Sequence, residues 1–81
     1  MSDARRALER ARAASPTAKE VEDALAALDA LAPQCDRWVA DAMRMFYIEG
    51  RTWRDVGAEL GYSAVHVRRS VHRALAAARQ R

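Results

Sequence analysis

The stretch TWRDVGAELGYS, residues 52–63, decides how this chain folds. Thr52 is a favourable residue for capping a helix, and Asp55 stands where a capping box usually has Glu or Gln. Apolar residues recur at helical spacing, at Trp53, Val56 and Leu60. The pattern therefore predicts a short helix that begins after Thr52 and ends at Leu60, where Gly61 stops it.

A second helix is expected directly after this turn, capped by Ser63 and running from Ala64 to about Arg79. One side of it is apolar, through Val67, Val71, Leu75 and Ala78. The other side carries Val65, His66, Arg68, Arg69, His72 and Arg73. A short helix, a tight turn containing glycine and a longer helix with a basic outer face together predict a helix-turn-helix.

Gly57 lies in the middle of the first of these two helices, where glycine costs roughly 1 kcal/mol relative to alanine. It precedes Gly61 by one helical turn, on the face directed toward the second helix. Two helices that cross through so short a turn approach each other closely, and a residue without a side chain allows that approach. We therefore expect Gly57 to be the contact point of the two helices.

The first part of the chain is expected to form two helices. Ser2 is the cap candidate for a helix through Ala14, but its only large apolar residue is Leu8, so we expect this segment to dock weakly. A capping box of Thr17 and Glu20 begins the next helix, over 18–32. Its apolar stripe consists of Val21, Ala24, Leu25, Leu28, Leu31 and Ala32.

A further helix is expected between Pro33, which ends the preceding one, and about Glu49. Its wide apolar face consists of Trp38, Val39, Ala42, Met43, Phe46 and Tyr47. Gly50 follows in the left-handed position of a helix end, and both Trp38 and Trp53 are expected in the core. The scarcity of Gly and Pro and the absence of alternating β-branched runs predict an all-α bundle of four to five helices that ends in the helix-turn-helix. Residues 1–16 form a flanking helix or arm in this prediction, and 17–81 form the domain.

Charge is distributed unevenly along the chain of 81 residues, whose net charge is +3. Residues 1–50 carry seven Lys or Arg and nine Asp or Glu, whereas residues 51–81 carry seven Arg and only Asp55 and Glu59. A basic end of this kind attracts a polyanion, most plausibly nucleic acid. A solubilising Arg-rich tail is the competing interpretation, and charge alone does not separate the two.

Several other classes of function are not expected. A domain of this size has little room for a substrate cleft, so we expect no enzyme, small-molecule substrate or cofactor. Cys35 is the single cysteine, and no Cys and His cluster has metal-ligand spacing. Ser70 and His66 lack the third group that a nucleophilic site needs. No signal peptide or membrane-spanning run is present, which favours a soluble, cytoplasmic protein.

The predicted motif and its flanks carry the residues of one family. They are Phe46-Tyr47-Ile48-Glu49-Gly50 before the motif, Thr52 through Ser63 across the first helix and turn, and Val67 and His72-Arg73-Ala74-Leu75 in the second helix. The stretch from about Leu28 to Arg79 thereby resembles the region-four domain of bacterial sigma factors and, more broadly, sigma-like regulators of phages and prophages. No region-two domain precedes the motif, so a complete sigma factor is not expected. Members usually have a small residue, most often alanine, at the position of Gly57, which implies that alanine is tolerated there.

The resemblance implies that the second helix enters the major groove of double-stranded DNA. Ala64 and Val65 would then meet thymine methyl groups, and the expected base-reading side chains are His66, Arg68 and Arg69, with Arg69 the first candidate for guanine. Phosphate contacts are expected from Arg51, Thr52, Arg54, Ser63 and Arg73. His72 is expected to pack at the edge of the core.

Two alternatives remain open beside a transcription regulator that binds DNA, as a monomer or as a homodimer. The first is a protein-interaction module that contacts RNA polymerase or a regulatory partner, with an incidental basic face. The second is a phage packaging protein that recognises a site on DNA.

Overall fold

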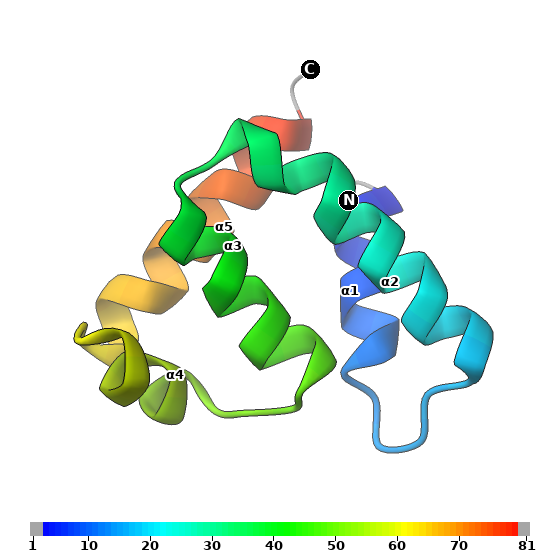
Figure 1. Ribbon diagram of the computed structural model, residues 1–81, viewed down its shortest axis with the longest axis horizontal. Coiled ribbons are helices and arrows are strands. Elements are labelled where there is room, and N and C mark those ends of the chain that lie inside the picture. Colours follow the sequence, from blue (N-terminus) through cyan, green and yellow to red (C-terminus); the bar gives the residue numbers. More distant parts are fainter. Residues whose placement is uncertain (1–2, 80–81) are drawn as a thin grey trace.

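Five α-helices follow one another in the computed structural model, which describes residues 3–79 (Figure 1). Their bounds are α1 Asp3–Ala11, α2 Ala18–Leu31, α3 Arg37–Met43, α4 Trp53–Leu60 and α5 Ala64–Arg79. A 3-10 turn, η1 (Ala32–Gln34), follows α2, and a π-helical turn, η2 (Arg44–Ile48), continues α3. Within the described range there is no strand, so the predicted all-α bundle is confirmed.

The helices form two pairs joined by α3. Figure 1 shows α1 and α2 as an antiparallel pair on one side, and α3 with η2 in the middle, between this pair and α4 and α5. In this view the α5 helix passes behind α3. The two ends of the described chain both lie in the upper half of the view. The middle segment 37–48 therefore contacts every other helix and forms the centre of the fold.

The expectation that the N-terminal helix docks weakly is wrong. Leu8 is fully buried and Ala11 is 5% exposed, and α1 packs along α2 over its length. The helix ends at Ala11 rather than at Ala14, and the expected Ser2 cap lies outside the described residues. One leucine and several alanines are enough for docking because small side chains let two helices approach closely.

The capping box that begins α2 is confirmed. The Thr17 hydroxyl accepts a hydrogen bond from the Glu20 amide at 3.1 Å, and the Glu20 carboxylate accepts one from the Thr17 amide at 2.9 Å. The predicted apolar stripe is too wide, because Leu25 is 44% exposed. The helix presents a narrower set to the core, namely Ala24, Leu28 and Leu31.

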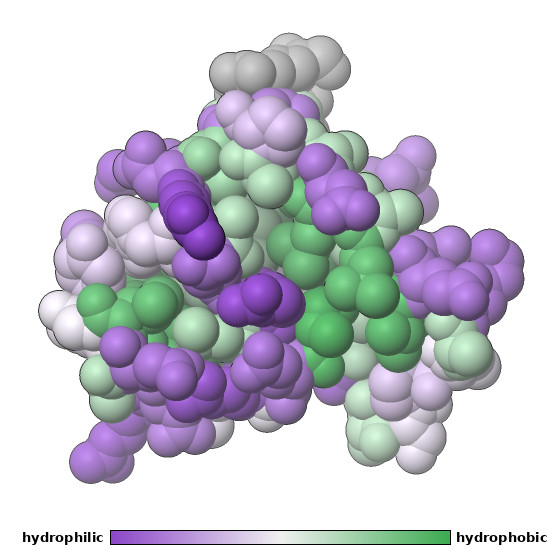
Figure 2. Space-filling view, viewed as in Figure 1, coloured by the Kyte–Doolittle hydropathy of each residue, from purple (hydrophilic) through white to green (hydrophobic). Residues whose placement is uncertain are grey.

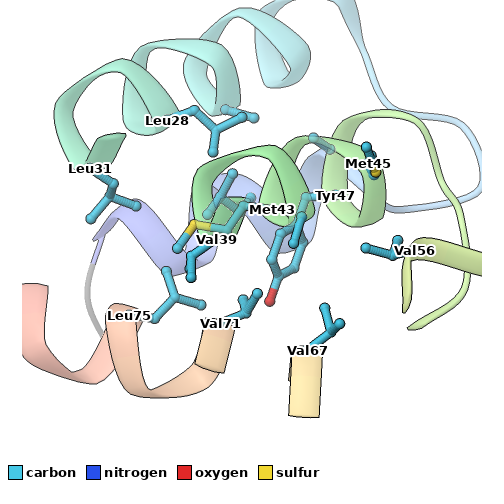
Figure 3. Packing of buried hydrophobic residues seen from close by; sticks show 14 residues of the cluster. Leu28, Leu31, Val39, Met43, Met45, Tyr47, Val56, Val67, Val71 and Leu75 are labelled. Atoms are coloured by element: carbon cyan, nitrogen blue, oxygen red, sulfur yellow. The ribbon is translucent and has the colours of Figure 1, made fainter. Parts of the chain in front are cut away.

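The core gathers side chains from all five helices (Figure 3). Its buried members are Leu8, Ala11, Ala24, Leu28, Leu31, Val39, Ala42, Met43, Met45, Tyr47, Val56, Val67, Val71 and Leu75. Tyr47 lies at its centre with its hydroxyl end near Val71 (Figure 3), and burial is the main cause that raises the pKa of this phenol. The η2 turn, in which the Glu49 amide donates to the Arg44 carbonyl at 3.1 Å, turns Met45 and Tyr47 inward. Trp38 and Trp53 were expected in the core but are half-buried at its edge.

The predicted caps around α4 and α5 are confirmed. The Thr52 hydroxyl accepts from the Asp55 amide, and the Ser63 hydroxyl accepts from the His66 amide, both at 3.1 Å. Gly61 ends α4 in the left-handed region with φ +83°. The connection between α4 and α5 is therefore the three-residue turn 61–63.

Gly57 is buried against this turn and the start of α5. A Cβ atom built on Gly57 would lie 2.5 Å from the Tyr62 carbonyl oxygen, 3.2 Å from the Ser63 carbonyl carbon and 3.3 Å from the Ala64 nitrogen. The predicted close approach at Gly57 is therefore present. The expectation that alanine is tolerated there is contradicted, because all three neighbours are backbone atoms.

Candidate nucleic-acid interface

The exposed face of α5 is organised around a single row of side chains. Because an α-helix turns by about 100° per residue, Val65, Arg69 and Arg73 lie one above the other. All three are exposed, Val65 by 50%, whereas the opposite side of the helix is buried through Val67, Val71 and Leu75. We call Val65, Arg69 and Arg73 the outer row of α5. Arg68 is also exposed and flanks the row.

The guanidinium groups on this side of the molecule have no acidic partner. Among residues 3–79, no ion pair forms at Arg54, Arg68, Arg69 or Arg73, whereas Lys19, Arg44 and Arg51 each pair with a carboxylate. No acidic residue follows Glu59 in the sequence. The α5 surface therefore carries uncompensated positive charge, which is the electrostatic feature that attracts an anion.

Arg51 differs from the other arginines predicted to contact phosphate. Its guanidinium forms an ion pair with Glu59 and lies 3.8 Å from the Glu49 carboxylate. Such partly exposed pairs are worth only about 0–1 kcal/mol, so a stronger anion can displace them. A phosphate contact at Arg51 would therefore compete with this pairing, whereas Arg54 and Arg73 form no ion pair among residues 3–79.

His66 is exposed, but its ring belongs to an aromatic group on the turn. The Trp38 and Tyr62 rings stack with their centroids 4.4 Å apart, and the His66 ring lies 5.6 Å from Trp38 and 5.1 Å from Tyr62. This group ties the start of α5 to the start of α3. Any other contact made by the His66 ring would therefore compete with this stacking, whereas no ring contact forms at the outer row of α5 among residues 3–79.

The remaining predicted contacts lie at the two helix starts. The hydroxyl groups of Thr52 and Ser63 already accept hydrogen bonds from helix amides. Ala64 is half-buried beside the turn. The two hydroxyl groups therefore cap α4 and α5, and their O–H groups remain hydrogen-bond donors.

An arginine directly after α1 also reaches this part of the molecule, and sequence reasoning missed it. Arg12 contacts Phe46 and the carbonyl oxygen of Arg51, which are 34 and 39 residues away. No local spacing pattern reports a contact over such a separation. Beside it lies an open cleft of about 320 Å³, lined by Arg5, Glu9, Arg12, Ala13, Phe46, Tyr47, Trp53 and His72.

His72 packs at the edge of the core, as predicted. Its ring meets the Trp53 ring edge-on, with centroids 6.0 Å apart. Partial burial is the main cause that lowers the pKa of His72, and the nearby Arg5 and Arg68 lower it further. The imidazole is therefore neutral near pH 7.

Three further observations concern metal binding, the single cysteine and membrane association. No group of three or more His, Cys, Asp or Glu side chains within residues 3–79 is arranged to hold a metal ion. Cys35 is half-buried, with its thiol 3.6 Å from the Leu31 carbonyl oxygen, and burial is the main cause that raises its pKa. None of the described helices is both long enough and apolar enough to cross a membrane.

Comparisons with protein-family models, with curated proteins and with solved structures found no match to this chain.

Proposed function

We propose that this protein is a sequence-specific DNA-binding regulator whose α5 helix enters the major groove. The observation that carries the proposal is the outer row of α5. Its two arginines have no acidic partner among residues 3–79, and the helix itself contains no acidic residue. A major groove is wide enough to admit one such helix. The resemblance to sigma region four points in the same direction.

In the proposed complex, some side chains contact bases and others contact phosphates. Arg69, in the middle of the outer row, makes bidentate hydrogen bonds to guanine O6 and N7, and Val65 contacts a thymine methyl group. Arg73 and Arg54 contact phosphates on either side, which holds the protein in register without reading sequence. Arg68 flanks the row and contacts a base edge or a phosphate.

The test begins with selection of bound duplexes from random DNA, followed by anisotropy titrations from about 50 to about 200 mM salt. Affinity should fall linearly on a double-logarithmic plot. Arg69→Ala should remove about 1–3 kcal/mol of discrimination at one base pair, whereas Arg54→Ala should weaken binding to all sequences and reduce the salt slope by about 1. Half-sites about 10 bp apart in the selected DNA would indicate a dimer.

Arg10→Ala is the matched control, because Arg10 is exposed on α1 and its loss changes net charge by the same amount. It should leave affinity and sequence preference nearly unchanged. If the Arg68→Ala, Arg69→Ala double variant binds with wild-type affinity and sequence preference, α5 is not the recognition helix.

A protein-interaction module is the second candidate, and one observation favours it. Leu25 is 44% exposed above a groove of about 190 Å³ between α2 and α3, and Figure 2 shows apolar surface gathered there. The groove is lined by Leu25, Leu28, Asp29, Ala32, Ala40, Asp41 and Arg44. Leu25→Asp should abolish binding to purified RNA polymerase if this candidate holds, and should leave DNA affinity unchanged.

A further inference from the structure

Arg12 connects the N-terminal helix to the segment that leads into α4. Its guanidinium carbon lies 3.6 Å from the centre of the Phe46 ring, and its Nη1 atom donates hydrogen bonds to the carbonyl oxygens of Phe46 and Arg51, the latter at 2.8 Å. A cation over an aromatic face and charge-assisted hydrogen bonds are both attractive. One side chain thus contacts both η2, at Phe46, and the segment between η2 and α4, at Arg51.

The contact continues through stacked rings to both helices of the proposed DNA-binding unit. The Phe46 and Trp53 rings are nearly parallel, with centroids 3.5 Å apart and an interplanar angle of 8°. Trp53, the first residue of α4, meets His72 of α5 edge-on. Arg12, Phe46, Trp53 and His72 therefore form a continuous series of contacts, which we call the Arg12 stack.

The segment 49–52 connects η2 to α4 and lies outside both of these helical elements. The Arg51 amide donates to the Met45 carbonyl at 3.1 Å, and the Arg51 carbonyl accepts from Arg12. These two bonds hold the backbone directly before the Thr52 cap. Loss of the Arg12 bond frees one of the two.

We propose that Arg12 is a positioning residue that sets the orientation of α4 and α5 relative to the rest of the molecule. This inference rests on the proposed function, because its consequence is a DNA-binding unit that includes α1. Arg12 touches no DNA in this arrangement. It acts by raising the fraction of molecules in which the outer row of α5 and the start of α4 are held together for binding.

The experiment compares Arg12→Ala, Arg12→Lys and the control Arg10→Ala, at a temperature where circular dichroism shows all of them folded. Arg12→Ala should weaken binding to the selected duplex by about three- to tenfold, as expected when the competent fraction falls by that factor. The salt slope should not change, because no phosphate contact is lost. Arg12→Lys keeps the charge but lacks the planar group that stacks and donates twice, so it should restore little of the affinity.

A readout without DNA keeps the inference separate from the proposed function. The chain contains two histidines, and the ring proton resonances of His72 report the position of the Trp53 ring. Arg12→Ala and Arg12→Lys should both shift the His72 resonances while those of His66 change less, and Arg10→Ala should shift neither. If the wild-type protein binds no DNA, the proposed function fails, and these shifts still report whether Arg12 positions α4 and α5.

Two results would overturn the inference. One is a reduction of the salt slope by about 1 in Arg12→Ala, which would make Arg12 a phosphate contact. The other is unchanged His72 resonances in both Arg12 variants, which would show that the stack does not depend on Arg12.

Discussion

Gly57 and Tyr62 are joined so closely that no side chain fits between them. The Tyr62 amide donates to the Gly57 carbonyl at 2.9 Å, and a Cβ atom on Gly57 would lie 2.5 Å from the Tyr62 carbonyl oxygen. The turn thus folds back over the end of α4. This geometry reverses the expectation drawn from the resemblance to sigma region four, whose members usually have alanine at this position.

Gly57→Ala should destabilise the protein. Alanine gains about 1 kcal/mol in helix propensity, but overpacking against a backbone oxygen costs about 1–3 kcal/mol. We expect a net loss of up to about 2 kcal/mol in the free energy of unfolding, measured by urea denaturation. The control is Ala58→Gly at the next, exposed position of α4, which should lose about 1 kcal/mol through propensity alone. A Gly57→Ala protein as stable as wild type would show that the turn moves away freely.

Leu8 and Leu25 form a matched pair for testing whether α1 belongs to the core. Leu8 is fully buried and Leu25 is 44% exposed, although both lie on helices of the same pair. Leu8→Ala should cost about 2–5 kcal/mol of unfolding free energy, whereas Leu25→Ala should change it by less than about 0.5 kcal/mol. Equal effects in a denaturation experiment would mean that α1 does not dock as described.

Ser63→Ala should remove the cap of α5. The hydroxyl of Ser63 accepts from the His66 amide at 3.1 Å, and loss of such a cap costs about 1 kcal/mol. Ser63→Asp retains an acceptor, so it should retain most of the stability in thermal unfolding. If Ser63→Ala unfolds at the wild-type temperature, the His66 amide has found another partner, such as water.

His72 should make stability fall as the pH is lowered toward 5. The pKa of His72 in the folded protein is below its ordinary value of 6.5, so the unfolded chain binds more protons in this range. The free energy of unfolding is therefore expected to fall as the pH drops through 6.5 toward the folded pKa. Urea titrations at a series of pH values between 7.5 and 5 measure this slope. His72→Gln should reduce this slope, and a slope that survives His72→Gln would assign it to other groups.

The local features of this fold follow from residues close together in the sequence. The caps at Thr17, Thr52 and Ser63 and the stop at Gly61 are all where the sequence predicts them. Each depends on a hydrogen bond or a backbone angle within three residues of the cap, so the residue types are enough. The buried side of α5, with Val67 and its neighbours, follows from helical spacing in the same way.

The tertiary structure decided which apolar side chains of α1 and α2 are buried. Leu8 is buried although it is nearly alone on its helix, and Leu25 is exposed within a regular apolar stripe. Periodicity reports which side of a helix is apolar, but only the packing of α1 against α2 decides how much of that side is covered.

The same holds for the charged and aromatic side chains of the proposed interface. Arg51 is paired with Glu59, His66 lies on Trp38, and Arg12 reaches Phe46, while Arg69 has no acidic partner among residues 3–79. The sequence alone marks Arg51, His66 and Arg69 as candidates without showing which of them have partners, and it gives no sign of the Arg12 contact. These contacts depend on how α1, α3 and α4 are placed around α5, because residues up to 39 positions apart meet only once the chain is folded.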